Sequence, residues 1–471
     1  MAMIEKKMGN PRRRMLVLVA GFMLSFQAVS AWSMTLREAT ELAVKTYPDV
    51  LAAEEFGKAL DQKVQQAFAG YLPKMDFTTG YGPETSDNTT TRAVTGNTIA
   101  KRALTMDREE AGLVVRQNLF DGFDTRTKVA QARAQLAAAQ ARLALTADSV
   151  GLQAVQAYVD LVMKHIQLEL IKDNVLLHQR ILDKVQKKYE GGAGTEADVH
   201  QAKSRTFLAS ANHASNQAAY KSAQAKFTEI IGLPPLKEQE MVRPQVPEAL
   251  LPKSVEDSLA AALHNNPELA TARFNVTAAE AALENAKAIL WPRLDMELAA
   301  SDNANVGGAE GTAKAASAMV RMNYNLFNGG ADLARFREQK NMLEQARQTQ
   351  EKTQRALEEN TRETWDRLTM AQNRIGFMRQ HYEVSKQVTA SYHDQFKMGK
   401  RTLLDVLNSE NELFAAKNGL LFEELSYIKS AYELFARMGM LQEAVAAEPV
   451  ASHQELLMEK GGASDFGPLA P

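Results

Sequence analysis

The polar residues with the clearest potential for chemistry lie in two short turns of the sequence. Asp198 belongs to the first turn, and Arg401 and Asp405 belong to the second. Side chains of these types form ion pairs and hydrogen bonds, cap the first turn of a helix or, for carboxylates, bind a cation. None of these roles makes or breaks a covalent bond. The residue types in the two turns therefore indicate structural or electrostatic roles and not catalysis.

Residues for catalysis or for binding a metal or a cofactor do not gather anywhere in the chain. The sequence contains no cysteine, which excludes disulfides and cysteine metal sites, and its eight histidines are scattered. We find no motif of a hydrolase, a nucleotide-binding protein or a zinc site. The charge is close to balanced and no basic patch suggests nucleic acid. The sequence thus predicts a protein that is not an enzyme and needs no cofactor.

The two turns are copies of one another within a long internal repeat. Residues 189–207 return as residues 396–414, and every matched pair is 207 positions apart. The same offset relates Leu119-Phe120 to Leu326-Phe327. A single register held over so many residues indicates a tandem duplication in which each copy is one structural unit. The matched pairs in the turns are Tyr189 with Phe396, Gly192 with Gly399, Thr195 with Thr402, and Asp198 with Asp405.

Residues 1–31 have the pattern of a secretory signal peptide. Basic residues are followed by an apolar run from Met15 to Phe26 and then by the small residues Val29-Ser30-Ala31. The alternative is an uncleaved membrane anchor, but the apolar run is short for a membrane span. No later stretch is apolar enough for a transmembrane helix. If the mature chain enters a membrane, it must do so with strands.

Each copy predicts helix, hairpin, long helix, tight turn and helix. The hairpin strands are expected at about residues 74–82 and 111–120 in the first copy, and at about 293–301 and 317–327 in the second, from residues that alternate between apolar and polar. The copies span residues 32–233 and 254–443. A proline-rich linker at 234–253 joins them, and we expect residues 444–471 to be a disordered tail.

The long helices are unusual for a globular domain. Each begins soon after a hairpin and continues to the following turn, which gives a rod of about 100 Å. The second is polar on almost every side between Glu344 and Thr364. Such a helix suits the wall of a water-filled tube, and a solvated coiled-coil rod explains this segment almost as well.

Counting strands predicts the oligomeric state if the hairpins enter a membrane. Four strands cannot close a barrel, and open strand edges are not tolerated in lipid. Two chains supply eight strands, which is too narrow for a channel, whereas three chains supply twelve. The predicted architecture is therefore mainly helical with a small β part, in a homotrimer that shares one transmembrane barrel.

The ordered motifs resemble the TolC-type outer-membrane efflux and type I secretion channels over most of the region from Thr35 to Glu443. The resemblance rests on Asn-Leu-Phe-(Asp/Asn)-Gly after each hairpin, on Leu-Pro or Trp-Pro before each hairpin, and on FKMGKRTLLDVL at residues 396–407. It implies a homotrimeric twelve-stranded barrel in the outer membrane of a Gram-negative cell, continuous with a periplasmic helical tunnel. It also implies outer-membrane lipid, a periplasmic adaptor, and an inner-membrane ABC or proton-driven pump as partners.

The resemblance places the two turns at the periplasmic entrance of the tunnel. It implies gate residues at Asp198, Phe396, Arg401 and Asp405. Members of the family often have a second acid where this chain has Asn408, so the ring of charge would be less negative here. The simpler alternative is that Asp405 only caps the helix that Thr402 begins. The residues implied for docking of the adaptor are Gly192, Thr195, Gly399 and Thr402.

Taken together, the sequence predicts an outer-membrane exit duct of a tripartite export system, serving either type I protein secretion or small-molecule efflux. The duct is passive and is gated at its periplasmic end. The competing function is an extended coiled-coil structural protein of the periplasm or cell surface. The two alternating hairpins favour the duct, because a rod has no use for them.

Overall fold

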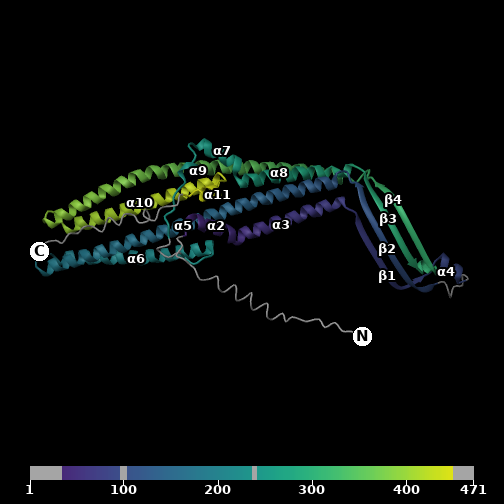
Figure 1. Cartoon of the computed structure of the whole chain (residues 1–471), viewed down its shortest axis with the longest axis horizontal. Helices are drawn as coiled ribbons and strands as arrows, with labels where there is room; N and C mark the ends of the chain where they lie inside the picture. The colour runs from purple at the N-terminus through teal and green to yellow at the C-terminus, as the bar shows by residue number, and fades with distance from the viewer. Residues whose placement is uncertain (1–33, 96–102, 236–240, 449–471) are drawn as a thin grey trace, which may run out of the picture.

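A computed structural model describes residues 34–95, 103–235 and 241–448 (Figure 1). The expected signal peptide at residues 1–31 lies outside these ranges. The expected tail at 444–471 is described only as far as Glu448, and its first residues belong to helix α11 (Leu441–Ala446). The molecule is elongated, with a sheet at one end and paired long helices at the other (Figure 1).

The first repeat contains α2 (Leu36–Thr46), α3 (Pro48–Phe68), β1 (Lys74–Ser86), β2 (Leu104–Phe120), α5 (Asp124–Glu190) and α6 (Glu196–Ile231). The short α4 (Thr89–Val94) lies in the hairpin loop, and the 3-10 turn η1 (Ala69–Tyr71) precedes β1. Helix α3 begins at Pro48, where the missing N–H costs nothing because the first turn has no partner for it.

The second repeat has the same order. It contains α7 (Val255–Asn265), α8 (Pro267–Ala286), β3 (Arg293–Ala304), β4 (Thr312–Asn323), α9 (Ala331–Lys397) and α10 (Leu403–Arg437). Short 3-10 turns lie at η4 (Glu248–Leu250), η5 (Ala288–Leu290) and η6 (Val306–Gly308). Asn266 caps α8 by accepting hydrogen bonds from the amides of Glu268 and Leu269 at 2.9 and 3.2 Å.

The four strands form one antiparallel sheet in the order β1-β2-β3-β4. The strands of the first hairpin extend further toward its loop than the sequence predicts, because pairing continues to Ser86 opposite Leu104. Strand β4 starts earlier than expected and ends at Asn323 instead of near residue 327. Asn323, the last residue of β4, pairs with Arg293, the first residue of β3. Pro292 precedes Arg293 and has no N–H to continue the ladder.

The long helices α5 and α9 each contain 67 residues, which corresponds to about 100 Å. Helix α6 packs along α5, and α10 packs along α9, so each repeat ends in a helical hairpin. Helix α8 contacts both α5 and α9 and joins the two halves near the sheet. Within the described ranges, no helix combines the length and the apolar composition that crossing a membrane requires.

The main hydrophobic core lies midway along the molecule, where both repeats and the linker meet. Tyr158 of α5 and Tyr432 of α10 are completely buried there. The Tyr158 hydroxyl is 2.8 Å from the carbonyl oxygens of Met34 and Val242, and the Tyr432 hydroxyl donates to the Gln245 carbonyl at 2.9 Å. These bonds attach Met34, the first described residue, and the linker to the helices, so we call this region the collar.

Glu448 attaches the end of the described chain to the same collar. Its carboxylate accepts hydrogen bonds from the backbone amides of Arg37 at 3.1 Å and Gln245 at 3.4 Å. Burial raises the pKa of Glu448 to about 7, although these two hydrogen bonds act in the opposite direction. The folded chain therefore holds a proton at this site that the unfolded chain has already released.

We expect the stability of the collar to fall as the pH rises from about 4.5 to about 7. In this window the unfolded state releases the Glu448 proton while the folded state retains it, which costs up to about 3 kcal/mol at the upper end. Thermal unfolding followed by circular dichroism between pH 4.5 and 8 measures the effect. Glu448→Gln should flatten the profile, whereas Glu443→Gln at an exposed position of α11 should leave it unchanged. Parallel profiles for all three proteins would contradict the assignment to Glu448.

Candidate functional site

The two repeated turns lie side by side at the end of the molecule opposite the sheet (Figure 1). The first joins α5 to α6 and the second joins α9 to α10. Gly192 and Gly399 have φ angles of 76° and 72°, a left-handed conformation that other residues rarely adopt. A side chain added at either glycine would meet open space. The glycines are thus required by the turn and not by close packing.

A reciprocal hydrogen-bond pair fixes the start of the helix after each turn. In the second turn the Asp405 amide donates to the Thr402 hydroxyl at 3.2 Å, and the Thr402 amide donates to the Asp405 carboxylate at 3.0 Å. Thr195 and Asp198 make the same pair in the first turn, at 3.2 and 3.3 Å. Both acids therefore satisfy amides that an uncapped helix would leave without partners.

The cap also favours the ionised form of Asp405. Hydrogen bonds from Thr402 hold the pKa of Asp405 below its usual value, and the nearby Arg401 acts in the same direction. Both bonds from Thr402 reach one oxygen, Oδ2. The carboxylate is partly exposed and remains ionised at any pH near neutrality, so it can cap the helix and still present charge to its surroundings.

Arg401 and Phe396 make contacts that the sequence did not reveal. The Arg401 guanidinium lies 4.2 Å from the centre of the Tyr392 ring, and its Nε donates to Gln395 at 2.9 Å. The Lys188 ammonium of α5 lies 4.4 Å from the centre of the Phe396 ring of α9. Arg401 is thereby held against its own helical hairpin, whereas Phe396 contacts the other hairpin through a cation–π interaction.

A small hydrophobic cluster joins the ends of the two hairpins. Ile181 and Val185 of α5 pack with Leu403 and Leu407 of α10, and Phe396 lies at the edge of the cluster. The cluster brings three of the four helices together, and Ala202 of α6 completes it. Phe396 is therefore the only expected gate residue that this cluster includes. Asp198, Arg401 and Asp405 have their described hydrogen bonds within their own turns, and Asn408 is exposed.

Sequence reasoning also missed a buried acid close to the second turn. Glu410 is 8% exposed, and its Oε1 lies 2.5 Å from Nε2 of His393 on α9. The neighbouring Thr389 hydroxyl donates to the Ser409 carbonyl at 3.0 Å. These contacts bind α9 to α10 just above the turn. The sequence signal was weak, because an acid and a histidine 17 positions apart on different helices have no fixed spacing.

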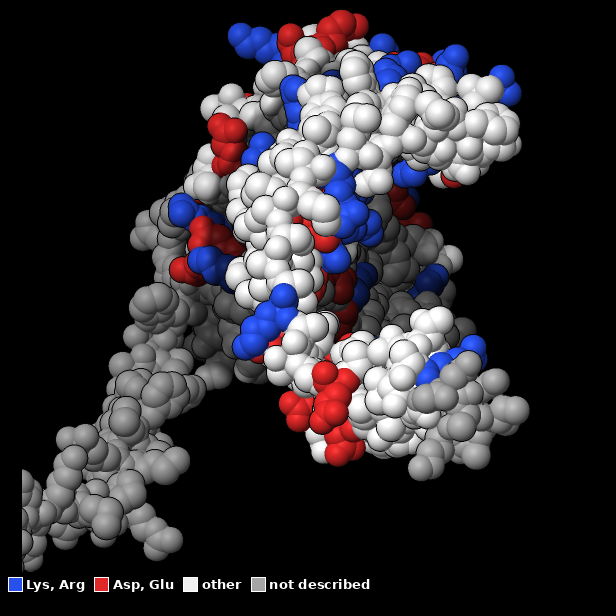
Figure 2. Space-filling model, turned by 90° about the vertical axis from the view of Figure 1, so that its right-hand side faces the viewer, with Lys and Arg blue, Asp and Glu red and all other residues white. Residues whose placement is uncertain are grey.

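At the opposite end, the sheet has one apolar and one polar face. Register places Met75, Val115 and Leu298 in one row, and Phe77, Leu113 and Ala300 in the next. The other face carries Lys74, Arg116 and Glu297 in one row. Viewed from the sheet end, the molecule is hollowed on one side, and acidic and basic side chains gather in the hollow (Figure 2). A surface of this kind separates an apolar environment from an aqueous one.

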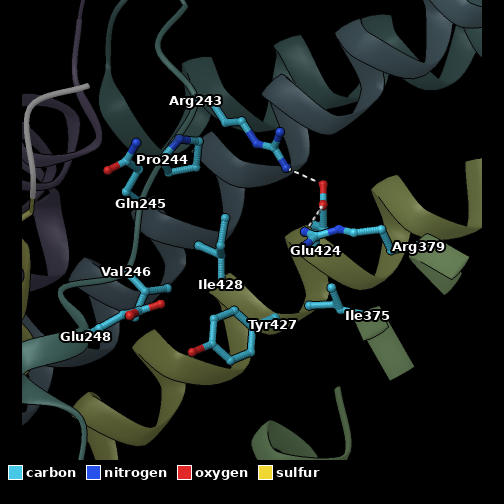
Figure 3. Close-up of a pocket in the computed structure, with 10 residues that line it drawn as sticks. All are labelled: Arg243, Pro244, Gln245, Val246, Glu248, Ile375, Arg379, Glu424, Tyr427 and Ile428. Carbon is cyan, nitrogen blue, oxygen red and sulfur yellow. Dashed lines mark hydrogen bonds and ion pairs between the residues drawn. The ribbon is translucent and has the colours of Figure 1, made fainter. Parts of the chain in front are cut away.

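A pocket of about 530 Å³ lies between the linker and helices α9 and α10 (Figure 3). Glu424 occupies its rim between two cations: Arg243 Nη2 lies 2.5 Å and Arg379 Nη2 lies 3.3 Å from its carboxylate oxygens. Ile375, Tyr427 and Ile428 supply apolar walls. The charged groups neutralise one another and tie the linker to both helices, which indicates a structural joint and not a reactive site.

Comparison with known proteins identifies relatives over nearly the whole chain. The family model described as "Outer membrane efflux protein" matches residues 40–233 and 259–440, one segment in each repeat. The outer membrane efflux protein BepC of Brucella suis is 27% identical over 430 residues, covering 90% of this chain and 89% of its own. The alkaline protease secretion protein AprF of Pseudomonas aeruginosa is 25% identical, covering 92% of this chain and 90% of its own.

Solved structures share the fold. The outer membrane protein VceC of Vibrio cholerae has a TM-score of 0.71 and 18% sequence identity, and the match covers 86% of this chain and 96% of that one. At this identity the likeness concerns architecture alone. It extends over both repeats, so the hairpins and the long helices are arranged here as they are in that protein.

We expect Thr402→Ala to loosen the start of α10 by removing the cap, at a cost of about 1 kcal/mol. Hydrogen exchange of the amides of Asp405 and Val406, which donate to Thr402, should accelerate about fivefold, while exchange in the middle of α10 should not change. Thr402→Ser is the matched control, because serine keeps the hydroxyl. Equal exchange in the alanine and serine variants would show that the cap contributes little.

Proposed function

The chain belongs to the outer membrane efflux protein family, whose members are passive channels and not enzymes, and from this premise we propose that its two repeated turns form the gate of an export duct. The duct lies in the outer membrane and continues as a periplasmic helical tunnel. Substrate passes from the turns, along the long helices, to the hollow of the sheet. No bond of the substrate changes, so transport depends only on passage and on opening.

The amphipathic sheet is the observation that best supports the duct. Its apolar face carries exposed Phe77, Tyr81 and Val320, which are 69%, 74% and 63% exposed in the single chain. Burying them in lipid is favourable, whereas leaving them in water is not. The charged hollow on the opposite face suits a water-filled interior. A coiled-coil rod, the competing function, would have no use for either face of the sheet. Membership of the efflux protein family also argues against a rod.

Members of this family form trimers and work in tripartite export systems. For this chain we propose a homotrimer that meets a periplasmic adaptor at the exposed turns, with an inner-membrane pump of the ABC or proton-driven type behind it. Gly192 and Gly399 create the turns, and Thr195 and Thr402 fix the helices that follow.

Photo-crosslinkers at Ala193 and Lys400 should capture a tagged adaptor in cells. Capture only at positions distant from the turns would show that the adaptor docks elsewhere.

The gate we propose combines the contacts at the two turns. In a trimer the three copies of Asp405 surround one axis as a ring of ionised carboxylates, and Asn408 leaves the next ring neutral. Asp198 adds the matching acid of the first turn. Arg401 is held by Tyr392 and Gln395, and Phe396 joins the second hairpin to Lys188 of the first. Opening requires the second hairpin to move away from the first, which breaks the Lys188–Phe396 contact.

The cargo can be proposed only as two classes. BepC is named as an efflux protein, whereas AprF and PrtF of Dickeya chrysanthemi are named as secretion proteins for proteases. This chain is similar to all three over most of its length. We propose that it serves either small-molecule efflux or type I protein secretion, and that the pump and the adaptor decide between them.

We expect Asp405→Asn to reduce the cation preference of single channels in a planar bilayer. Three charges about 10 Å from an axis attract a cation by on the order of 1 kcal/mol before salt screening, so the permeability ratio should fall by roughly twofold. Arg401→Ala should strengthen the cation preference, because it removes the positive charge that acts on Asp405.

The controls separate charge from folding. Asp405→Asn keeps an oxygen that can accept from Thr402, whereas Thr402→Ala removes the cap and keeps the charge. Thr402→Ala and Asp61→Ala, an exposed acid on α3, should both retain the selectivity of the natural chain. If Thr402→Ala shifts selectivity as much as Asp405→Asn does, the effect comes from the cap. If well-folded protein gives no channels, the duct itself is wrong.

A further inference from the structure

A continuous row of ion pairs crosses the polar face of the sheet. Arg116 of β2 lies 3.6 Å from Asp76 of β1 and 3.2 Å from Glu297 of β3. Glu297 in turn lies 3.6 Å from Arg321 of β4. The row therefore has one residue on each strand, in the order β1, β2, β3, β4. Its charges alternate along this order: negative, positive, negative, positive.

The two ends of this row are open. Glu297 in the middle has two cationic partners, and its side chain is 20% exposed. Asp76 and Arg321 at the ends have one described ion-pair partner each, and their side chains are 60% and 53% exposed. Both lie on edge strands, because β1 and β4 have no further neighbour in the sheet. One edge thus ends in an anion and the other ends in a cation.

We propose that Arg321 of one copy pairs with Asp76 of the next, so that the rows of three copies close into one ring of alternating charge around the lumen. This proposal rests on the trimeric duct proposed above and specifies how its seams are formed. Strand β4 runs antiparallel to a neighbouring β1 when the barrel closes, as consecutive strands do within the chain. Edge strands in lipid must be paired in this way, because their backbone groups have no water to bond.

The charges select one register for the seam. When Arg321 lies opposite Asp76, Asn323 lies opposite Lys74 and Val320 lies opposite Phe77. No like charges meet, and an aromatic and a β-branched residue pair on the apolar face, which favours strand pairing. Sliding two residues one way would place Arg321 opposite Lys74, which already faces Arg116 on its other side, so three cations would lie in one row. Sliding two residues the other way would place Arg321 opposite the uncharged Thr78 and Asp76 opposite Asn323. Sliding one residue would turn the charged side chains toward the lipid.

A second charge on β3 does not compete for the seam. Asp295 lies opposite Arg321 in the register, but its carboxylate is 2.9 Å from Nε of Arg293 on the same strand. Arg321 therefore keeps its exposed side for the neighbouring copy. In the closed ring the positive and negative charges at this level of the lumen balance. The ring also favours pairing of β4 with β1 of the next copy, since of the two edge strands only β1 has an acid to pair with Arg321.

Cysteine crosslinking tests the seam directly, because the natural chain has no cysteine. The double variant Asp76→Cys/Arg321→Cys, treated with a short thiol–thiol crosslinker, should yield covalent trimers on denaturing gels. Directly opposed positions on paired strands have Cβ atoms only about 5 Å apart. The matched pairs Lys74→Cys/Arg321→Cys and Thr78→Cys/Arg321→Cys lie on the same face and test the two slipped registers. We expect at least a fivefold lower yield from each of them.

Light scattering of the natural chain and of the uncrosslinked variants in detergent measures the oligomeric state, and so tests the trimeric duct separately from the seam. Absence of trimers in the natural chain would overturn the duct. Trimers that crosslink best through residue 74 or residue 78 would leave the duct intact and overturn the seam we propose.

Charge inversion supplies an independent readout. The variant D76R/R116E/E297R/R321E, combined with D295N so that no acid faces position 321, reverses the row and keeps its ion pairs within the chain and in a trimer of its own kind. A mixed trimer with the natural chain would instead place Arg321 against an arginine and Asp76 against an acid. Coexpressed with separate tags, the two chains should form mixed trimers at least about fivefold less often than two differently tagged natural chains. Mixing at the statistical frequency would overturn the proposal.

Discussion

The structure depends first on the unpaired backbone of its two edge strands. A four-stranded antiparallel sheet leaves the outward-pointing N–H and C=O groups of β1 and β4 without partners in the sheet, and lipid offers nothing to replace them. The chain also exposes Met75, Phe77 and Met322, which only lipid or another copy can bury. These two requirements are met together when the edges join those of other copies. The small sheet, only a minor part of the chain, therefore carries the main physical argument for the trimer that we propose.

The helical part converts that closed sheet into a long conduit. Helices α5 and α9 leave the sheet directly, and α3 and α8 pack beside them where the strands end. Farther along, the collar holds the two repeats together through Tyr158, Tyr432 and the linker. Beyond the collar the described contacts between the hairpins include a small cluster around Leu403 and Leu407 and the Lys188–Phe396 contact. The hydrophobic cluster near the turns is smaller than that of the collar, so the end at which we place the gate is held by fewer packing contacts.

The repeated motifs allowed much of this to be predicted from the sequence. Glycines and threonines at fixed spacing located both turns, and alternating residues located the strands, because turn geometry and pleat are local properties. The row from Asp76 to Arg321 could not be predicted, since it depends on the register of four strands. The contact of Lys188 with Phe396 joins helices far apart in the sequence and left no local pattern. Asp198 was expected at the gate, and its cap with Thr195 emerged only from the structure.

The two interpretations of Asp405, as a helix cap and as a gate residue, are physically compatible. The cap uses one oxygen of the carboxylate, and its hydrogen bonds lower the pKa, so the same contacts that fix the side chain keep it charged. The reciprocal cap also fixes the carboxylate relative to the turn. A carboxylate stabilised in this way does not respond to modest changes of periplasmic pH. In the gate that we propose, opening therefore comes from movement of the second hairpin as a whole, and a partner bound at the exposed turns would drive that movement.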